Sequence, residues 1–172
     1  LFKYHPACYG VHAPTEAALA LRLQDGFDPA LVEKIEISVP QNCIGMCDIA
    51  EPTTGLEAKF SLAHNVALGL LNKADGALEL YMDESFEVDG VAPLRAKAVV
   101  EGKPEFNSFY SEITVHQKDG KVLHQEFDIG KPMRDLDEQE AKLAKKFRAL
   151  AKPLVGEGEA DELVAAIAGL EN

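Results

Sequence analysis

Residues 110–127 read YSEITVHQKDGKVLHQEF, and this stretch decides the class of fold that the sequence predicts. Apolar and polar side chains alternate on both sides of a four-residue connection, as they do in half-buried β-strands. The connection contains Asp119-Gly120, a pair that supplies the backbone angles of a tight turn. We therefore expect two antiparallel strands, at about 110–117 and 122–127, joined as a hairpin.

Two further segments extend this sheet. Ile35, Ile37 and Val39 alternate with polar neighbours until Pro40 ends the pattern, and residues 95–101 have the composition of another strand. Together with the hairpin they predict a small, mainly antiparallel sheet of about four strands. Because helical patterns occur before and between these strands, the predicted fold class is α+β, with the sheet covered by helices.

Helix signals precede and separate the strands. Pro14, followed by Thr15-Glu16, predicts the start of a helix that ends near residues 25–26. Thr54-x-x-Glu57 forms a capping box at the start of a second, long helix. Its buried face would repeat at helical spacing to about residue 72, through Leu56, Phe60, Ala63, Ala67 and Leu71. Residues 75–93 predict short helical pieces.

The C-terminal segment differs from the rest. Asp135-x-x-Glu138 caps a predicted helix that runs to residues 152–153, and residues 163–170 predict a second, short one. Both have apolar stripes that a four-stranded sheet has little room to cover. We therefore divide the sequence into an α+β domain, 1–133, and two C-terminal helices, 134–172. Because Leu1 opens directly inside a patterned segment, we expect a fragment of a longer chain.

Composition narrows the possible partners and the compartment. The formal net charge is −12 and no Lys/Arg cluster occurs, which argues against nucleic acids and anionic membranes as partners. No apolar run approaches the roughly 18 residues of a membrane helix. The three cysteines are odd in number and form no disulfide framework, so we expect a reducing, cytoplasmic setting.

Reactive side chains gather in the opening loop, where Lys3, His5, Cys8 and His12 precede a predicted helix. A lysine offers a cation for a carboxylate, and histidine transfers protons near neutral pH. The alternative is a surface loop with incidental titratable groups. A zinc site made by His5-x-x-Cys8-x-x-x-His12 together with Cys43-x-x-x-Cys47 is a further alternative. The spacing of the Cys43–Cys47 pair exceeds the two intervening residues of common zinc sites, and we predict no metal.

His64 is the remaining candidate. Its position, eight residues after Leu56, puts it at the edge of the apolar face of the predicted long helix. A single histidine at such a position is usually a hydrogen-bonded core residue. We therefore keep two interpretations of His64, as a core residue and as an active-site residue.

Two segments resemble signatures of the MmgE/PrpD family, which includes 2-methylcitrate dehydratase, cis-aconitate decarboxylase and iminodisuccinate epimerase. Residues 2–12, FKYHPACYGVH, with Glu16-Ala17 after them, are similar to a Lys-x-Tyr/Phe-Pro-Cys-Cys segment followed by His and Asp-Ala. Residues 52–64, PTTGLEAKFSLAH, are similar to a Pro-x-Thr-x-x-Glu-Ala-Lys-Phe-Ser-x-x-Tyr helix. The segment 130–147 is similar to the closing segment of the family.

The resemblance implies a two-domain enzyme whose active site lies between a large helical domain and a smaller α+β lid. Residues 1–133 would be the lid, and 134–172 would pack on the missing large domain. Lys3 would bind a substrate carboxylate, and His12 matches a histidine of the family. Cys8 stands where cis-aconitate decarboxylase has an active-site histidine, and His64 where the family usually has a tyrosine. These two departures argue against decarboxylation of cis-aconitate.

The function implied is that of a lid of a cofactor-independent dehydratase acting on a small polycarboxylate such as 2-methylcitrate. Catalytic candidates are Cys8, His12 and His64, with Lys3 as the substrate-binding residue. A dicarboxylate isomerase or epimerase is the second reading, and a non-catalytic α+β binding module is the third. We expect a homo-oligomer, with residues 1–172 inactive by themselves.

Overall fold

A computed structural model describes residues 2–171, with a four-stranded sheet at its centre in the order β2-β1-β3-β4. The strands are β1 (Val32–Pro40), β2 (Ala98–Lys103), β3 (Tyr110–Gln117) and β4 (Val122–Asp128). β1 pairs in parallel with β2 and antiparallel with β3, which pairs antiparallel with β4. Ile35 lies opposite Ala98 on one side and Val115 on the other. The predicted α+β class and mainly antiparallel sheet are confirmed.

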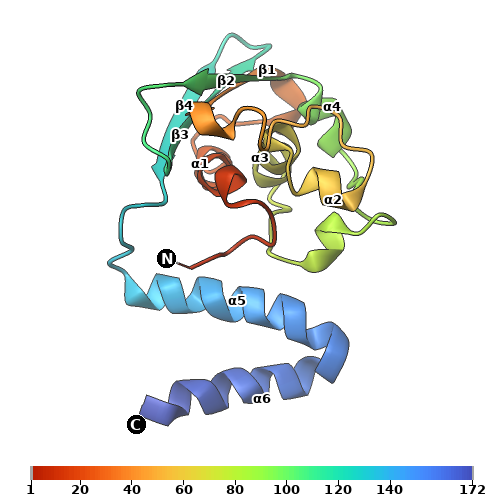
Figure 1. Ribbon diagram of the computed structural model, residues 1–172, viewed down its shortest axis with the longest axis vertical. Helices are drawn as coiled ribbons and strands as arrows, with labels where there is room; N and C mark the ends of the chain where they lie inside the picture. Colours follow the sequence, from red (N-terminus) through yellow and green to blue (C-terminus); the bar gives the residue numbers. More distant parts are fainter. Residues whose placement is uncertain (1, 172) are drawn as a thin grey trace.

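Two helices pack against each other and against this sheet (Figure 1). α1 (His12–Leu21) contacts β3 and β4, while α3 (Leu62–Leu70) lies nearer β2. In β1 and β3 the residues that face these helices are buried and most of those between them are half-buried or exposed, whereas β4 has half-buried and exposed residues in alternation. The core is therefore one apolar layer between helices and sheet, which includes Leu21, Ile35, Ile37, Leu62, Leu68, Leu70 and Ile113.

α1 and α3 approach each other closely at Gly69. A methyl group at this position would lie 2.7 Å from Ala18 Cβ and 3.0 Å from the carbonyl oxygen of Thr15. Both distances are shorter than an ordinary contact between packed atoms, which is about 3.5–4.0 Å. The two helices can cross at this separation because Gly69 has no side chain.

We expect Gly69→Ala to lower the free energy of unfolding by about 1–3 kcal/mol, because the added methyl forces α1 and α3 apart. Urea denaturation followed by circular dichroism measures the change. Gly158→Ala is the matched control, since a methyl there meets no described atom within 4 Å. That exposed helical position should be unchanged or up to about 1 kcal/mol more stable. Equal stability of the two variants would contradict the close-approach argument.

The single long helix predicted from Thr54 to about residue 72 is wrong. The structure has two helices there, α2 (Gly55–Ala58) and α3, separated at residues 59–61. The break occurs because this backbone pairs with the 47–49 loop: Leu62 N–H donates to the Cys47 carbonyl at 2.9 Å. Ser61 then caps α3 by accepting from His64 N–H at 3.2 Å. Leu56, expected on the buried face, is exposed.

Several local predictions hold. Thr54 Oγ1 accepts from Glu57 N–H at 3.2 Å, although the Glu57 carboxylate reaches back to Thr53 rather than Thr54. Gly120 takes the positive φ of the β3–β4 turn. The 75–93 segment contains a 3₁₀ turn and the start of α4 (Val91–Arg95), and because α4 continues to Arg95, β2 begins at Ala98 rather than at residue 95.

The C-terminal helices α5 (Leu136–Val155) and α6 (Glu157–Ala168) pack mainly on each other and lie beside the sheet-and-helix body (Figure 1). Asp135 caps α5 by accepting from Glu138 N–H at 3.0 Å, as predicted. Large apolar side chains of this helix pair and of the 3₁₀ turn after it are exposed: Leu136, Leu154, Val155, Leu163, Ile167 and Leu170. Within residues 2–171, no helix combines the length and apolarity needed to cross a bilayer.

Candidate active site

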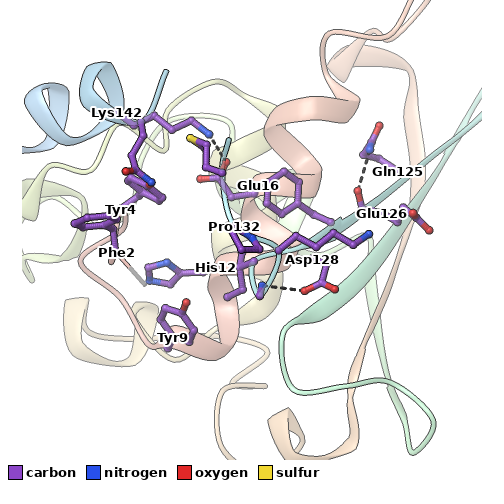
Figure 2. A pocket seen from close by; sticks show the side chains of 16 residues that line it. Phe2, Tyr4, Tyr9, His12, Glu16, Gln125, Glu126, Asp128, Pro132 and Lys142 are labelled. Carbon is purple, nitrogen blue, oxygen red and sulfur yellow. Dashed lines mark hydrogen bonds and ion pairs between the residues drawn. The ribbon is translucent and has the colours of Figure 1, made fainter. Parts of the chain in front are cut away.

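A cavity of about 670 Å³ lies between the N-terminal segment, the start of α1, β4 and the loop that leads to α5. Figure 2 shows its side chains, with the His12 ring pointing toward Tyr4 and Tyr9. Its volume is in the range of small-molecule sites. The lining residues include Phe2, Tyr4, Tyr9, His12, Glu16, Glu126, Asp128, Lys131 and Lys142.

His12 is the first residue of α1, and its side chain forms part of the cavity wall while only 2% exposed. A hydrogen bond to the Ala7 carbonyl engages the ring, and Nε2 has no partner within residues 2–171. In the tautomer that donates to Ala7 from Nδ1, the lone pair of Nε2 has no partner among the described residues. Burial first, then the positive charges of His5 and Lys3, lower the pKa of His12 to about 3. A neutral imidazole with a free acceptor nitrogen is the chemistry of a general base.

Glu16, one turn further along α1, is the centre of a buried ionic network. Its carboxylate lies 2.9 Å from His5 Nε2 and 3.2 Å from Lys142 Nζ, and Lys142 comes from α5. Burial alone would raise the pKa of Glu16, but the hydrogen bond from His5 and the charge of Lys142 lower it overall. Lys142 also lies over the Tyr4 ring, 5.6 Å from its centroid. The network ties α5 to the loop that precedes His12.

The charged side chains around the cavity do not make it strongly positive. Glu16, Glu126 and Asp128 contribute carboxylates, and Lys131 and Lys142 contribute amines. A small polycarboxylate needs an excess of cations, so these residues can supply only part of a site for such a ligand.

Lys3 and Cys8 lie beside the cavity rather than in its described lining. Lys3 is exposed, between the lining residues Phe2 and Tyr4, and its carbonyl accepts a hydrogen bond from Lys146. It is near enough to His12 for its charge to lower that pKa. Cys8 is half-buried, and its N–H donates to the Lys59 carbonyl at 2.9 Å. The structure thus brings Lys3 close to His12 and turns Cys8 toward a group of other thiols.

His64 belongs to a different polar group. It is fully buried on α3, with Nδ1 3.3 Å from Arg95 Nη1 and its ring against Phe86. Arg95 in turn binds Glu87 at 3.2 Å. Burial first, then the charge of Arg95, lower the pKa of His64 to about 4, and Nε2 has no partner in the described chain. His64 is not among the residues that line the cavity described above.

No role for Glu16 or Lys142 follows from the sequence alone. Glu16 is part of the first signature, but its ion pairs with His5 and Lys142 form only in the folded chain. Lys142 lies in the segment expected to pack on another domain, and no local pattern distinguishes it from the neighbouring lysines.

The zinc alternative has no cluster to support it in the part of the chain that the structure describes. No group of three or more His, Cys, Asp or Glu side chains among residues 2–171 is placed to hold a metal ion. His5, one of the proposed ligands, is engaged by Glu16 instead.

We expect acid to destabilise the protein through His12 and His64. Both rings have pKa values well below the ordinary 6.5, so the unfolded chain binds their protons first as pH falls. Stability should be lost from about pH 6.5 downward, by on the order of 5 kcal/mol for the two rings at pH 4.5. Urea denaturation at pH 7.0, 5.5 and 4.5 measures this.

Replacement of His64 by Phe should flatten the pH dependence, because one of the two titrating rings is removed. Replacement of the exposed His124 by Gln should leave it unchanged. A free energy of unfolding that stays constant between pH 7.0 and 4.5 would refute the burial of neutral histidines.

The family model described as the MmgE/PrpD C-terminal domain matches residues 5–172, almost the whole chain. A search of curated proteins found no match to the chain.

Proposed function

The chain belongs to the MmgE/PrpD family, and from that premise we propose that it is the lid portion of a cofactor-independent lyase acting on a small polycarboxylate. The favoured reaction is dehydration of a substrate such as 2-methylcitrate. The observation that carries the proposal is the free Nε2 of His12, a buried neutral imidazole in the wall of a cavity of suitable size.

His12 would remove a proton from the carbon next to a substrate carboxylate. Loss of a hydroxide group from the neighbouring carbon completes a dehydration, and return of a proton to the opposite face completes an epimerisation. An imidazole whose pKa is about 3 is a weak base. A carboxylate bound beside it would raise that pKa, so the base becomes effective when the substrate is present.

The other candidate residues have supporting roles in this proposal. Lys3, with Lys131 and Lys142 from the cavity wall, would bind substrate carboxylates. Cys8 and His64 keep the positions of active-site residues in the family, and they could act once a second domain closes on this one. The excess of positive charge that a polycarboxylate requires would come from the large helical domain of the same enzyme.

The exposed apolar side chains of α5 and α6 support this view of the large domain. An apolar surface of this kind is usually covered by another protein surface. We propose that residues 134–172 dock on the large helical domain and that the complete enzyme is a homo-oligomer.

The test uses the full-length enzyme and three substrates: 2-methylcitrate, cis-aconitate and iminodisuccinate. Incubation in D₂O adds a sensitive readout, because a proton removed next to a carboxylate exchanges with solvent even when no product accumulates. Dehydration or epimerisation with deuterium uptake supports the proposal. Tight binding of all three acids without turnover or exchange would favour the non-catalytic binding module.

Lys3→Ala in the full-length enzyme should raise KM by roughly ten- to more than a hundredfold. A charge-assisted contact contributes roughly 1.5–3 kcal/mol, and the substitution removes it. Steady-state kinetics with the preferred substrate measures the change. Lys118→Ala is the control, because Lys118 is an exposed residue of the β3–β4 turn. Unchanged KM and kcat for Lys3→Ala would remove Lys3 from the site.

A further inference from the structure

Three thiols meet next to Gly10, outside the cavity described above. Cys43 and Cys47 are buried and Cys8 is half-buried, and all three, which lie within the described residues, are free. A methyl group at Gly10 would lie 2.9 Å from Cys47 Sγ and 3.3 Å from Cys43 Sγ. The two sulfurs therefore flank the same point in space, next to the backbone that leads to His12.

The backbone of residues 43–47 holds these two cysteines at a separation that suits a disulfide. Cys47 N–H donates to the Cys43 carbonyl at 3.0 Å, which closes one helix-like turn. A turn of this kind separates the first and last Cα atoms by about 6 Å. Native disulfides join Cα atoms that are roughly 4.4–6.8 Å apart. Bond formation then needs side-chain rotation and little movement of the backbone.

The two thiols differ in reactivity. The Cys47 thiol donates to the backbone carbonyl of Cys43 at 3.6 Å. The contact between the two thiols lowers the pKa of Cys43, and the same contact, together with burial, raises that of Cys47. The thiolate is the reactive form of cysteine, so Cys43 is the nucleophile of the pair. Reversible redox sensors pair a thiol of lowered pKa with a second thiol and expose it to solvent. Cys43 has the lowered pKa and the neighbouring thiol, so its reaction also requires access from solvent.

We propose that Cys43 and Cys47 form a hydroperoxide-responsive dithiol site. The Cys43 thiolate attacks one oxygen of hydrogen peroxide, the O–O bond breaks, and Cys43 becomes a sulfenic acid while the leaving hydroxide takes up a proton. Cys47 sulfur then attacks Cys43 sulfur, the S–O bond breaks, and water leaves. Two thiols and one hydrogen peroxide thus give one disulfide and two waters, with the sulfurs oxidised by two electrons.

Access to the buried pair comes through the surface turn that carries it. Gly45 and Met46 are exposed, and Gly45 has a φ of +79° with no described atom within 4 Å of a methyl placed there. The tip of the turn is therefore open to solvent, whereas Ile44 and both cysteines pack into the core, so a local opening of the turn is needed to expose the sulfurs.

Cys8 is the competing partner. It is the most accessible of the three thiols and lies within hydrogen-bonding reach of Cys47. A Cys8–Cys47 bond would cross-link the opening loop to the 43–47 turn, whereas a Cys43–Cys47 bond stays within the turn.

Oxidation should also affect the candidate active site. An S–S bond of about 2.05 Å pulls the two sulfurs together beneath Gly10 and changes the packing under the turn that leads to His12. This consequence rests on the proposed function, whereas formation of the disulfide does not.

The experiment treats full-length protein with hydrogen peroxide, blocks the remaining thiols by alkylation and digests the protein with trypsin. Cys43 and Cys47 fall in the single peptide 35–59, and Cys8 falls in 4–22. We expect peptide 35–59 to lose about 2 Da, with recovery on addition of dithiothreitol. Cys8→Ser should behave in the same way, and Cys47→Ser should accumulate a sulfenic acid on Cys43 that dimedone traps.

A cross-link between peptides 4–22 and 35–59, or loss of all oxidation in Cys8→Ser, would overturn the assignment to Cys43 and Cys47. Alkylation of all three thiols after peroxide treatment would overturn it as well. Turnover measured on the same samples is a separate readout. An enzyme that never turns over substrate leaves the mass result interpretable, so failure of the dithiol site and failure of the proposed function are distinguishable.

Discussion

His12→Gln in the full-length enzyme should lower kcat by about 10²- to 10⁴-fold, the usual contribution of a positioned general base. Glutamine fills a similar volume and retains a hydrogen-bond donor for the Ala7 carbonyl, but it has no basic nitrogen to replace Nε2. KM should change much less than kcat, because His12 carries no positive charge with which to bind a carboxylate. The kcat measured in the steady state and the rate of deuterium uptake from D₂O should fall together.

The control for this variant is His124→Gln, an exposed histidine of β4 outside the described cavity lining. Its kcat should equal that of the parent enzyme. Circular dichroism and the unfolding midpoint show whether His12→Gln remains folded, since the ring is buried. A folded His12→Gln enzyme with a kcat within about threefold of the parent would exclude His12 as the base.

The second large effect is complete loss of catalysis in residues 1–172 by themselves. A polycarboxylate lyase needs a base, an acid and several cations held to within about half an ångström. The cavity of this chain offers one free imidazole, and its lining carries three carboxylates against two amines. The remaining cations and the acid would come from the large domain.

Assays of the isolated chain with the three acids, beside full-length enzyme at equal concentration, decide this. Light scattering gives the mass of the isolated chain, which we expect to exceed that of a monomer because α5 and α6 expose apolar side chains. Turnover of any of the three acids by residues 1–172 would contradict the expectation that part of the active site comes from the large domain.

The sequence predicted those parts of the fold whose determinants are local. The β3–β4 hairpin depends on alternation and on a turn glycine within eighteen residues, and the caps of α2 and α5 each depend on two residues three positions apart. The interruption between α2 and α3 could not be predicted in the same way. It depends on pairing with the 47–49 loop, whose own pattern carries no strand signal.

In the candidate site, too, features set by local sequence could be predicted and features set by distant contacts could not. Lys3, Cys8 and His12 lie within one short segment, so the sequence indicates all three as candidates, but only His12 is among the residues that line the cavity. The contact between Glu16 and Lys142 spans 126 positions, and neither side chain is unusual in its local context. The separation of His64 from the cavity depends on how α3 packs beside α4, which helical spacing alone does not determine.

The position of β1 in the sheet has a consequence for how the chain folds. β1 is an inner strand, yet the strands that pair with it, β2 and β3, come more than fifty residues later in the chain. During synthesis its apolar residues therefore leave the ribosome long before either edge can be paired. Contacts this distant in sequence slow folding and leave unpaired strands open to aggregation. Nascent chains that stall before residue 98 should depend on chaperones, whatever the stability of the finished protein.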